Sequence, residues 1–514
     1  MTRSTIKNTL FILLLTLCLS KTQAQSKELE NVVEVKLQNT VSIKNNNTIV
    51  GYALFYKVDK KRKADLYRLE ILDENLNALG NNEFEGSDKL QLDQAVYESE
   101  HILLAFSGDK KDDGYEKFVK VFDLKGKETG LIPYDPEKVK KGMFGAQIAE
   151  QMGKIYNGYN NIEGKGFVVV YQSKAKTGGA DIQVIDYTGK LKWEKNVTAE
   201  KGDRMDMYLT ATTPNALIFF CSERDGVMAR DAVNFLVGYD PESGKELYRK
   251  PMDISQFAWE PILFKTDNAN SLKMISSLSH EEDKFYSAKT IGFNIADLND
   301  KTGEIKLEKN FLLEKDLSTV MPMTSESKSE DGYVKMHDIC LMSDGSKVLV
   351  GEFFRRTVNG LGMGFKILSG GGGSASQASI GNLFLLRIDN KNNPVSLEKI
   401  EKETERVLLP ADGISIGLIT RLLTMEGDFG YMYTDEYADP NKKTVLVTGT
   451  FEGESYGTTA ITFDEKKGFK QKKFNIEKDK KEKVYLRKGK PGHVLVMKYN
   501  SKAKKISLNL ERVD

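Results

Sequence analysis

The chain has 514 residues, of which 40% are hydrophobic and 29% are charged, and its formal net charge is +1. Beyond residues 1–24 no stretch reaches the roughly 18 apolar residues that a membrane-spanning helix requires, which argues against a helical membrane protein. Three cysteines are too few for a disulfide framework. The length would fill several ordinary domains unless repeats build one large body.

The first 24 residues have the pattern of a removable secretory signal. Arg3 and Lys7 precede an apolar run over residues 10–19, and a stretch of small and polar residues ends at Ala24. We expect cleavage after Ala24, a short linker over 25–31, and an exported, soluble mature chain in the periplasm or outside the cell. Cleavage removes three bases and no acid, which leaves 72 bases against 74 acids and a net charge near −2.

Short apolar runs, dense in Val, Leu, Ile, Phe and Tyr, recur along the rest of the chain. Runs of this length bounded by Gly, Asn and Asp are typical of strands buried on both faces. Their starts lie at intervals that suit four-stranded units with insertions. Eight copies are found, at residues 47–57, 101–108, 166–173, 216–223, 272–279, 347–354, 428–435 and 493–499.

Most runs are followed by an alternating strand that ends in a turn with an Asp, whose carboxylate can accept backbone amide hydrogens. The last unit stops after its third strand, so a strand predicted at residues 32–37 (VVEVKL) can complete it and close a ring. The sequence therefore predicts an all-β fold, an eight-bladed β-propeller with four-stranded blades over residues 32–514. A seven-bladed ring is the alternative if residues 272–279 are not a strand of their own blade.

Three insertions depart from the minimal blade, at residues 131–157, 311–333 and 355–380. Asp135 and Pro136 are typical of a helix start. Apolar residues then follow at helical spacing, which predicts one short helix over 135–153.

The hairpin VIDYTGKLKWEKNV resembles the repeats of quinoprotein-like, tryptophan-docked propellers, whose outer hairpins read Asp-x-x-Thr-Gly-Lys followed by an aromatic residue. Two hairpins match well and a third, DKTGEIKL, matches loosely. The resemblance implies a packed outer hairpin with Trp193 covering a blade interface. The acids and amides that hold the quinone in that family have no counterpart here, so we expect no cofactor. The matching residues are Asp186, Thr188, Gly189, Lys190 and Trp193, then Asp240, Gly244, Lys245 and Tyr248.

The insertion at 355–380 is the first candidate binding site. Its GGGG stretch lacks the Lys that a phosphate-binding loop places after its glycines, so a linker or hairpin tip is the simpler interpretation. Its apolar residues would be costly to leave in water, and they either fold over a propeller face or dock on a partner. The candidate contacts are Arg355, Arg356, Phe365, Gly370, Gly371, Gly372 and Gly373.

The segment 465–505 is the second candidate, because it holds 16 Lys or Arg and 4 Asp or Glu. Lysine-decorated edge strands that resist aggregation would explain this charge. A basic face that meets an anionic surface is the alternative, with nucleic acid an improbable partner. The proposed basic patch is Lys472, Lys473, Lys480, Lys481 and Arg487.

Catalytic and metal sites have little support in the sequence. The four histidines have no close-spaced partner, so we expect no metal site. Cys221 and Cys340 are expected to be free, buried thiols. The sequence therefore favours an exported, non-enzymatic binding or scaffold protein of the cell envelope, with a protein or glycan partner at a propeller face. A hydrolase or lyase that acts on polysaccharide with carboxylates in the propeller funnel is the alternative.

Overall fold

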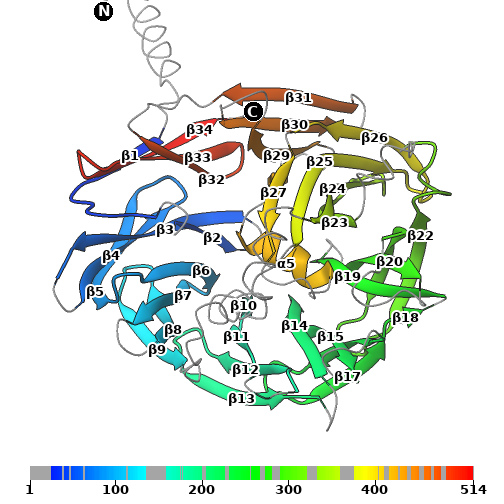
Figure 1. Ribbon diagram of the computed structural model, residues 1–514, viewed down its shortest axis with the longest axis horizontal. Helices are drawn as coiled ribbons and strands as arrows, with labels where there is room; N and C mark the ends of the chain where they lie inside the picture. The colour runs from blue at the N-terminus through cyan, green and yellow to red at the C-terminus, as the bar shows by residue number, and fades with distance from the viewer. Residues whose placement is uncertain are drawn as a thin grey trace, which may run out of the picture.

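A computed structural model shows a ring of eight antiparallel sheets, an eight-bladed β-propeller (Figure 1). The eight-bladed prediction is therefore confirmed over the seven-bladed one, and residues 272–279 lie within the second strand of the fifth blade proper. The structure describes residues 25–512 except 37–39, 46–47, 62–63, 111–113, 135–157, 174, 176, 200–203, 226–230, 255, 267–271, 281–289, 321–332, 359–375, 403, 410–415, 427–428, 437–441, 451–455, 465–467 and 476–481.

The first four blades follow one another along the chain, each running from an inner to an outer strand. They comprise β2 (Val41–Asn45), β3 (Thr48–Asp59), β4 (Asp65–Asp73) and β5 (Ala78–Gly86); β6 (Gln91–Glu98), β7 (His101–Lys110), β8 (Gly114–Asp123) and β9 (Glu128–Tyr134); β10 (Gly158–Ile162), β11 (Gly166–Gln172), β12 (Ala180–Ile185) and β13 (Leu191–Val197); and β14 (Arg204–Thr212), β15 (Leu217–Arg224), β16 (Val233–Tyr239) and β17 (Glu246–Pro251).

The last four blades include the irregular parts of the ring. They comprise β18 (Asp253–Ile254), β19 (Phe257–Thr266), β20 (Leu272–His280), β21 (Gly292–Leu298) and β22 (Ile305–Leu312); β23 (Tyr333–Leu341), β24 (Lys347–Val358), β25 (Ser376–Ile388), β26 (Pro394–Ile400) and β27 (Glu405–Leu408); then, after the helix α5 (Ile416–Glu426), β28 (Tyr431–Glu436), β29 (Lys442–Thr450), β30 (Tyr456–Asp464) and β31 (Gly468–Asn475); and β32 (Lys483–Lys488), β33 (His493–Asn500), β34 (Lys505–Arg512) and β1 (Gln25–Leu29).

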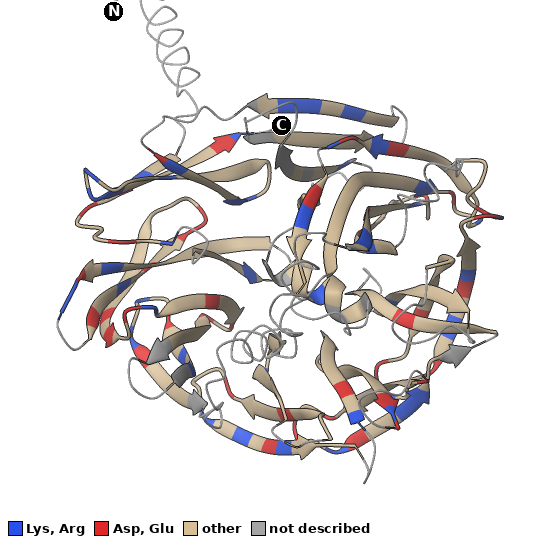
Figure 2. Cartoon of the chain, in the orientation of Figure 1, with Lys and Arg blue, Asp and Glu red and all other residues tan. Residues whose placement is uncertain are grey.

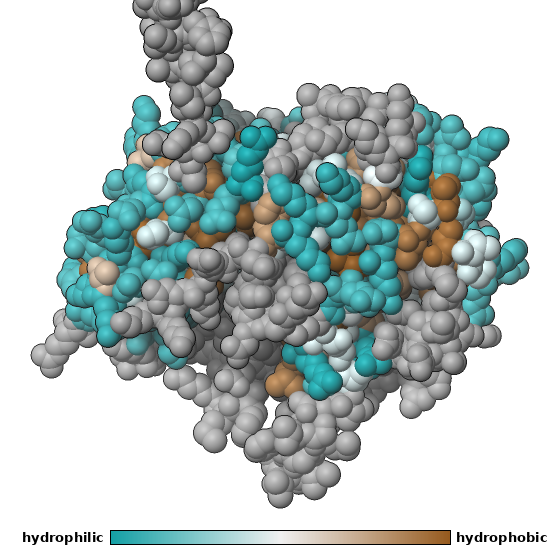
Figure 3. Space-filling model, turned by 90° about the horizontal axis from the view of Figure 1, so that it is seen from above, coloured by the Kyte–Doolittle hydropathy of each residue, from teal (hydrophilic) through white to brown (hydrophobic). Residues whose placement is uncertain are grey.

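The hydrophobic core lies between the blades. The second strand of a blade is buried on both faces, as in β11, where six of seven residues are buried. Each apolar cluster joins neighbouring sheets: one holds Phe55 of the first blade with Phe106 of the second, and another holds Leu54 of the first blade with Leu508 of the last. The outer strands are more polar, and the rim in Figure 3 is mainly hydrophilic with scattered hydrophobic patches.

Seven of the eight apolar runs are second strands, as predicted, but the run at residues 428–435 is not. Its strand is β28, the first strand of the seventh blade, and the second strand is β29. The sequence of β29, KKTVLVTGT, has only the three consecutive apolar residues VLV, flanked by threonines. Because β29 is less apolar than the other second strands, the run at residues 428–435 gives the stronger strand signal in the sequence.

The ring closes with an N-terminal strand, but the closing strand is β1 and not residues 32–37. Residues Gln25–Leu29 pair antiparallel with β34, so most of the predicted linker is a strand. The apolar character of residues 32–37 has another cause: Val32 and Val35 are buried between the last and first blades. Their segment is held by the amide of Val32, which donates to Lys504 O at 2.9 Å, and the amide of Val33, which donates to Lys57 O at 2.9 Å.

The three insertions are smaller than predicted. Residues 131–134 belong to β9, Leu313 and Leu317 are buried in the core, and the two ends of 355–380 are parts of β24 and β25. The helix predicted over 135–153 lies outside the described residues. The helix α5 was not predicted; Figure 1 shows it near the centre of the ring.

The outer hairpins use the predicted aspartate turns. Asp186 Oδ1 accepts the amide hydrogens of Thr188 and Lys190 at 2.8 and 3.0 Å, and Asp240 Oδ1 accepts those of Glu242 and Ser243 at 3.0 and 2.7 Å. These bonds fix the turn that joins each third strand to its outer strand.

Trp193 covers a blade interface, as the resemblance implied. Its indole Nε1 donates to Pro241 O at 2.8 Å, in the turn of the next blade. Gly244 in that turn has φ +68°, and a Cβ there would lie 3.0 Å from the indole ring. Tyr248 packs in the same way against Gly303 of the following blade. The Gly in the turn thus leaves room for the aromatic residue of the preceding blade.

Trp193→Ala is expected to lower the free energy of unfolding by about 1.5–3 kcal/mol, because it removes a half-buried side chain and the hydrogen bond to Pro241. Urea unfolding measures the change. Leu191→Ala, on the same strand at a 44% exposed position, is the control and should change stability by less than about 0.5 kcal/mol. Equal effects of the two substitutions would show that the aromatic docking is unimportant.

Candidate binding platform over the centre of the ring

Two strands of the sixth blade continue beyond the sheet. β24 and β25 have 12 and 13 residues, and past a register irregularity between Glu352 and Phe354 their ends pair with each other and with β27. Of these end residues, Phe354 also pairs with Tyr333 of β23. We call these three paired segments, residues 354–358, 376–380 and 405–408, the platform. Figure 1 shows it beside α5.

One face of the platform is fixed to the ring. Phe354, Ala378 and Ile380 are buried in the same cluster as Ile419, Leu422 and Leu423 of α5, and Val407 packs against it. The same cluster includes Tyr208 and Trp259 of the fourth and fifth blades. The platform, the helix and the inner strands therefore form one packed body.

The buried carboxylate of Glu352 holds the platform and the residues after α5 to the inner strand of the sixth blade. Its carboxylate lies 2.8 Å from His337 Nε2 on the inner strand β23 and 2.9 Å from Lys402 Nζ before β27. It also accepts the amide hydrogens of Gly430 and Tyr431, at 3.0 and 3.2 Å, just after α5. One carboxylate therefore joins the inner strand of the sixth blade, the approach to the platform and the start of the seventh blade.

The electrostatics of Glu352 follow from these contacts. The side chain is 0% exposed, and burial alone would raise its pKa, but the His337 hydrogen bond and the Lys402 charge outweigh burial and lower the pKa from 4.5 to about 2. Burial lowers the pKa of His337, which keeps the imidazole neutral at neutral pH. The carboxylate is thus held ionised as a structural group.

A β-bulge places His337. Met336 and Asp338 pair with consecutive residues of β24, so His337 is the extra residue and its side chain is re-aimed. Its ring stacks on Tyr431 with centroids 4.7 Å apart. Single extra residues occur at the same place in the inner strands of four other blades, at Asp93, Thr210, Ile262 and Met432.

Polar groups of the inner strands contact the helix α5. Arg421 Nη1 donates to Leu209 O at 2.9 Å, and its guanidinium lies 5.3 Å from the Tyr208 ring centroid. Burial lowers the pKa of Arg421 to about 10, and burial with the nearby Arg421 charge lowers the pKa of Lys335 to about 8. Two basic groups from α5 and β23 therefore lie close together at the centre of the ring.

Glu260, on the inner strand β19, meets the first turn of α5. Tyr208 Oη donates to Glu260 Oε1 at 3.5 Å, and a Cβ at Gly417 would overlap this carboxylate. Burial raises the pKa of Glu260 to about 7, and the hydrogen bond from Tyr208 lowers it by less than burial raises it. Gly417 thus leaves the space that the Glu260 carboxylate occupies beside the helix.

Glu260→Gln is expected to stabilise the protein relative to wild type as the pH rises from 5 to 8. The native pKa of about 7 exceeds the unfolded value of 4.5, so the stability from the protonated carboxyl is complete below pH 4.5 and is lost as the pH passes 7. The substitution removes this loss, so the free energy of unfolding of the variant should gain about 1–3 kcal/mol on that of wild type over this pH range. Urea unfolding at each pH measures it, with Glu194→Gln on the exposed outer strand as control. A difference independent of pH would contradict the prediction.

The first predicted binding residues are only partly brought together. Arg355 and Arg356 lie on β24 in the platform but on opposite faces, because neighbouring residues of a strand alternate. Arg356 shares the packed face with Phe354, and its Nε donates to Ser376 Oγ at 3.4 Å. Phe365 and Gly370 to Gly373 lie outside the described residues.

The predicted basic patch does not form one surface. Lys472 and Lys473 are exposed on the outer strand β31, whose basic bands are visible in Figure 2. Arg487 is on the inner strand β32, where burial lowers its pKa. Lys480 and Lys481 lie outside the described residues. Arg487 is therefore separated from the lysines by the width of the blades.

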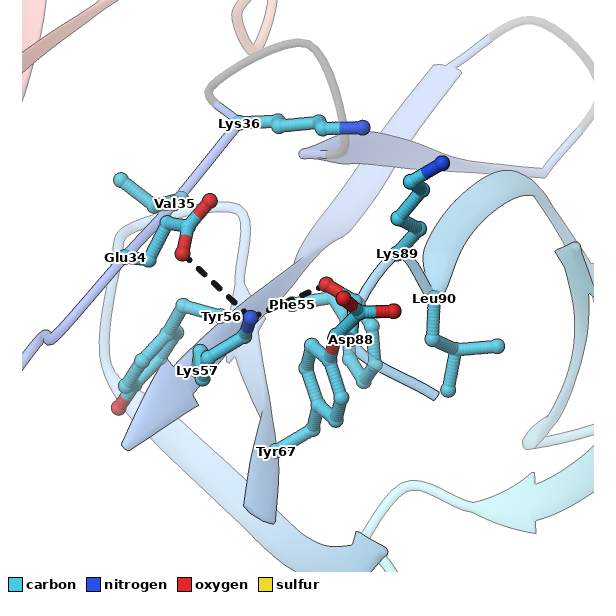
Figure 4. A pocket seen from close by; sticks show the side chains of 10 residues that line it. All are labelled: Glu34, Val35, Lys36, Phe55, Tyr56, Lys57, Tyr67, Asp88, Lys89 and Leu90. Atoms are coloured by element: carbon cyan, nitrogen blue, oxygen red, sulfur yellow. Dashed lines mark hydrogen bonds and ion pairs between the residues drawn. The ribbon is translucent and has the colours of Figure 1, made fainter. Parts of the chain in front are cut away.

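A small pocket lies on the first blade (Figure 4). Lys57 lies at its floor with its Nζ 2.6 Å from Asp65, 3.4 Å from Glu34 and 3.0 Å from Asp88 O. Lys36 and Lys89 are exposed at its edge. The buried lysine is fully engaged, so the pocket is a structural junction between the first blade and the segment after β1.

Other expectations concern cysteines, metals and membranes. Cys221 and Cys340 are free and buried, as predicted. Within the described ranges, no three His, Cys, Asp or Glu side chains are grouped so as to hold a metal ion. Of the helices that the structure describes, none has the length and apolarity to cross a membrane.

Sequence reasoning missed Glu352, Lys402, Glu260, Arg421 and Arg406. Glu352 had a signal, since a charged residue in the otherwise apolar run KVLVGEFF must find a buried partner. Its partners lie 15 and 50 residues away along the chain, which no local pattern can show. Glu260 meets Gly417, and Arg421 meets Tyr208, only because α5 packs against the inner strands.

The fold resembles solved propellers only in its architecture. A prolyl endopeptidase matches with a TM-score of 0.37 and 8% identity, over 88% of this chain and 54% of that one, so the chain spans about half its length. The β-propeller domain of the Trilobed protease from Pyrococcus furiosus matches with a TM-score of 0.32 and 11% identity, over 83% and 96%. None of the curated proteins matches the sequence.

Proposed function

From a chain that belongs, over residues 5–514, to a family described as "Family of unknown function (DUF6770)", we propose the following role. The protein is an exported, non-enzymatic binding or scaffold protein of the cell envelope, in the periplasm or outside the cell. The platform is the observation that carries the binding role. One of its faces is packed on α5, whereas Arg406 and the 61% exposed Leu408 point away from it. Binding groups held on a rigid scaffold are typical of recognition surfaces.

Export is supported by the signal-like residues 1–24 and by the position of β1. The first residue after the expected cleavage site, Gln25, is also the first residue of the closing strand. Cleavage after Ala24 therefore leaves every residue of the ring in place. N-terminal sequencing of the protein from its native cells tests this point, and a start elsewhere would contradict it.

A crosslinked pull-down from envelope extract tests the binding role. The bait is residues 25–514, and the comparison bait has only residues 359–375 replaced by a short Gly-Ser turn, because the flanking residues are platform strands that cover α5. A partner retained by the first bait and lost by the second would support binding at the insertion between the two platform strands β24 and β25. Failure of both baits to retain any protein or glycan would overturn the proposal.

A polysaccharide hydrolase or lyase is the second candidate, and Glu260 favours it. A carboxyl group with a pKa of about 7 on an inner strand has the protonation behaviour of a general acid. Hydrolysis would also require a second carboxylate at roughly 5–10 Å. Release of reducing ends or unsaturated products from acidic polysaccharides, lost in Glu260→Gln, would favour this candidate.

A further inference from the structure

The outward face of the platform carries two rows of mainly polar side chains, and the strand register gives their positions. Arg355 pairs with Ser379, and Ser379 pairs with Arg406, so these three side chains form one row on one face. Thr357, Gln377 and Leu408 form the next row on that face by the same pairings. The opposite rows contain the buried Phe354, Ile380 and Ala378, which fixes the first two rows outward.

The first row places two guanidinium groups on either side of a small hydroxyl residue. The two arginines are separated by two strand spacings of about 4.8 Å each, or roughly 10 Å between their backbones. Ser379 is 4% exposed and forms the floor between them, and Thr357 Oγ1 lies 3.2 Å from its Oγ. Glu405, the nearest acid of β27, belongs to the packed face. The row therefore carries like charges that face outward together.

We propose that this face of the platform binds a carboxylated polysaccharide, a chain that bears uronate groups. The planar guanidinium group binds a carboxylate through two parallel hydrogen bonds, and two such groups at a fixed separation can hold two carboxylates of one chain. The Thr357 and Gln377 side chains lie in the next row of the same face and can exchange hydrogen bonds with sugar hydroxyls. This proposal names the ligand of the binding role proposed above and depends on it.

The composition of the face favours a polysaccharide over other polyanions. Its two rows contain two Arg, one Ser, one Thr, one Gln and one Leu. Single-stranded nucleic acids are bound on aromatic stacking platforms, and these rows have no aromatic residue. A lipid surface is bound by basic clusters together with larger apolar area than a single Leu408 provides. The mature chain has a net charge near −2, so attraction to a polyanion must be local to this face.

The test is binding of polygalacturonate by the chain 25–514, measured by affinity electrophoresis and calorimetry, with dextran as the neutral polymer. We expect retention by polygalacturonate, none by dextran, and weaker binding at higher salt. Arg355→Gln with Arg406→Gln should weaken binding at least tenfold. Arg249→Gln, on the exposed outer strand β17, is the matched control and should bind as wild type does.

The outcomes separate the ligand from the wider function. Equal binding by wild type and the double variant, no preference over dextran, or binding of anionic phospholipid vesicles in place of polygalacturonate would each overturn the proposal. Urea unfolding of the double variant should stay within about 0.5 kcal/mol of wild type; if it does not, Arg406→Gln alone replaces it. A platform partner found in the pull-down while polygalacturonate fails would leave the binding role standing and remove only the polysaccharide.

Discussion

Glu352→Gln is expected to lower the free energy of unfolding by about 3–5 kcal/mol at pH 7, because it leaves the buried Lys402 without a counter-charge. The side chains of Glu352 and Lys402 are 0% and 2% exposed, so water cannot replace the lost partner. Urea unfolding at pH 7 measures the change. The exposed pair Arg68–Glu83 supplies the control, since Glu83→Gln should cost no more than about 1 kcal/mol.

The pH dependence gives a second measure of the same group. The native pKa of Glu352, about 2, is below the unfolded value of 4.5, so its stabilisation is present above pH 4.5 and is lost as the pH falls towards 2. Glu352→Gln should therefore approach wild-type stability in acid. Replacing Lys402 by Met in the same chain should recover part of the loss at pH 7. A uniform deficit at all pH values would show that the charge of Glu352 is unimportant.

Deletion of residues 25–30 is expected to destabilise the ring by several kcal/mol and to cause association. The deletion removes Leu29 from the cluster between the last and first blades, which alone should cost about 2–5 kcal/mol. It also exposes the edge of β34, whose unpaired backbone groups can pair with another chain. Thermal unfolding and light scattering measure the two effects.

Leu29→Ala separates the two effects of this deletion. It removes the buried side chain but keeps the backbone of β1, so it should lower stability without causing association. Ser26→Ala, whose side chain is exposed on the same strand, should change neither property. A monomeric deletion variant with wild-type stability would contradict the importance of the closing strand.

The sequence predicted the ring because its second strands are buried on both faces and therefore read as continuous apolar runs. It failed at β29, where threonines interrupt the run, and at β1, whose residues QSKEL show little apolar character. β1 forms because β34 offers it a partner, and its pattern contains only one buried side chain, Leu29. Strands of this kind are determined by pairing and not by their own composition.

The candidate site was predictable only in part. Arg355 was found from its place beside an unusual insertion, but its pairing with Ser379 and Arg406 depends on the register of three strands. The structure also divides Arg355 from Arg356, which the sequence presents as one pair. The contacts of Glu352 and of α5 bring together residues from several blades, and one sequence without this geometry cannot show them.

The pairing of β1 with β34 affects the order in which the parts of the ring fold. β34 spans Lys505–Arg512, so the pairing cannot form before these residues have been synthesised. Contacts between such distant segments form slowly, because a long loop must close first. We therefore expect the ring to close late in folding. Until β1 pairs, the edge of β34 stays available to the strands of other chains.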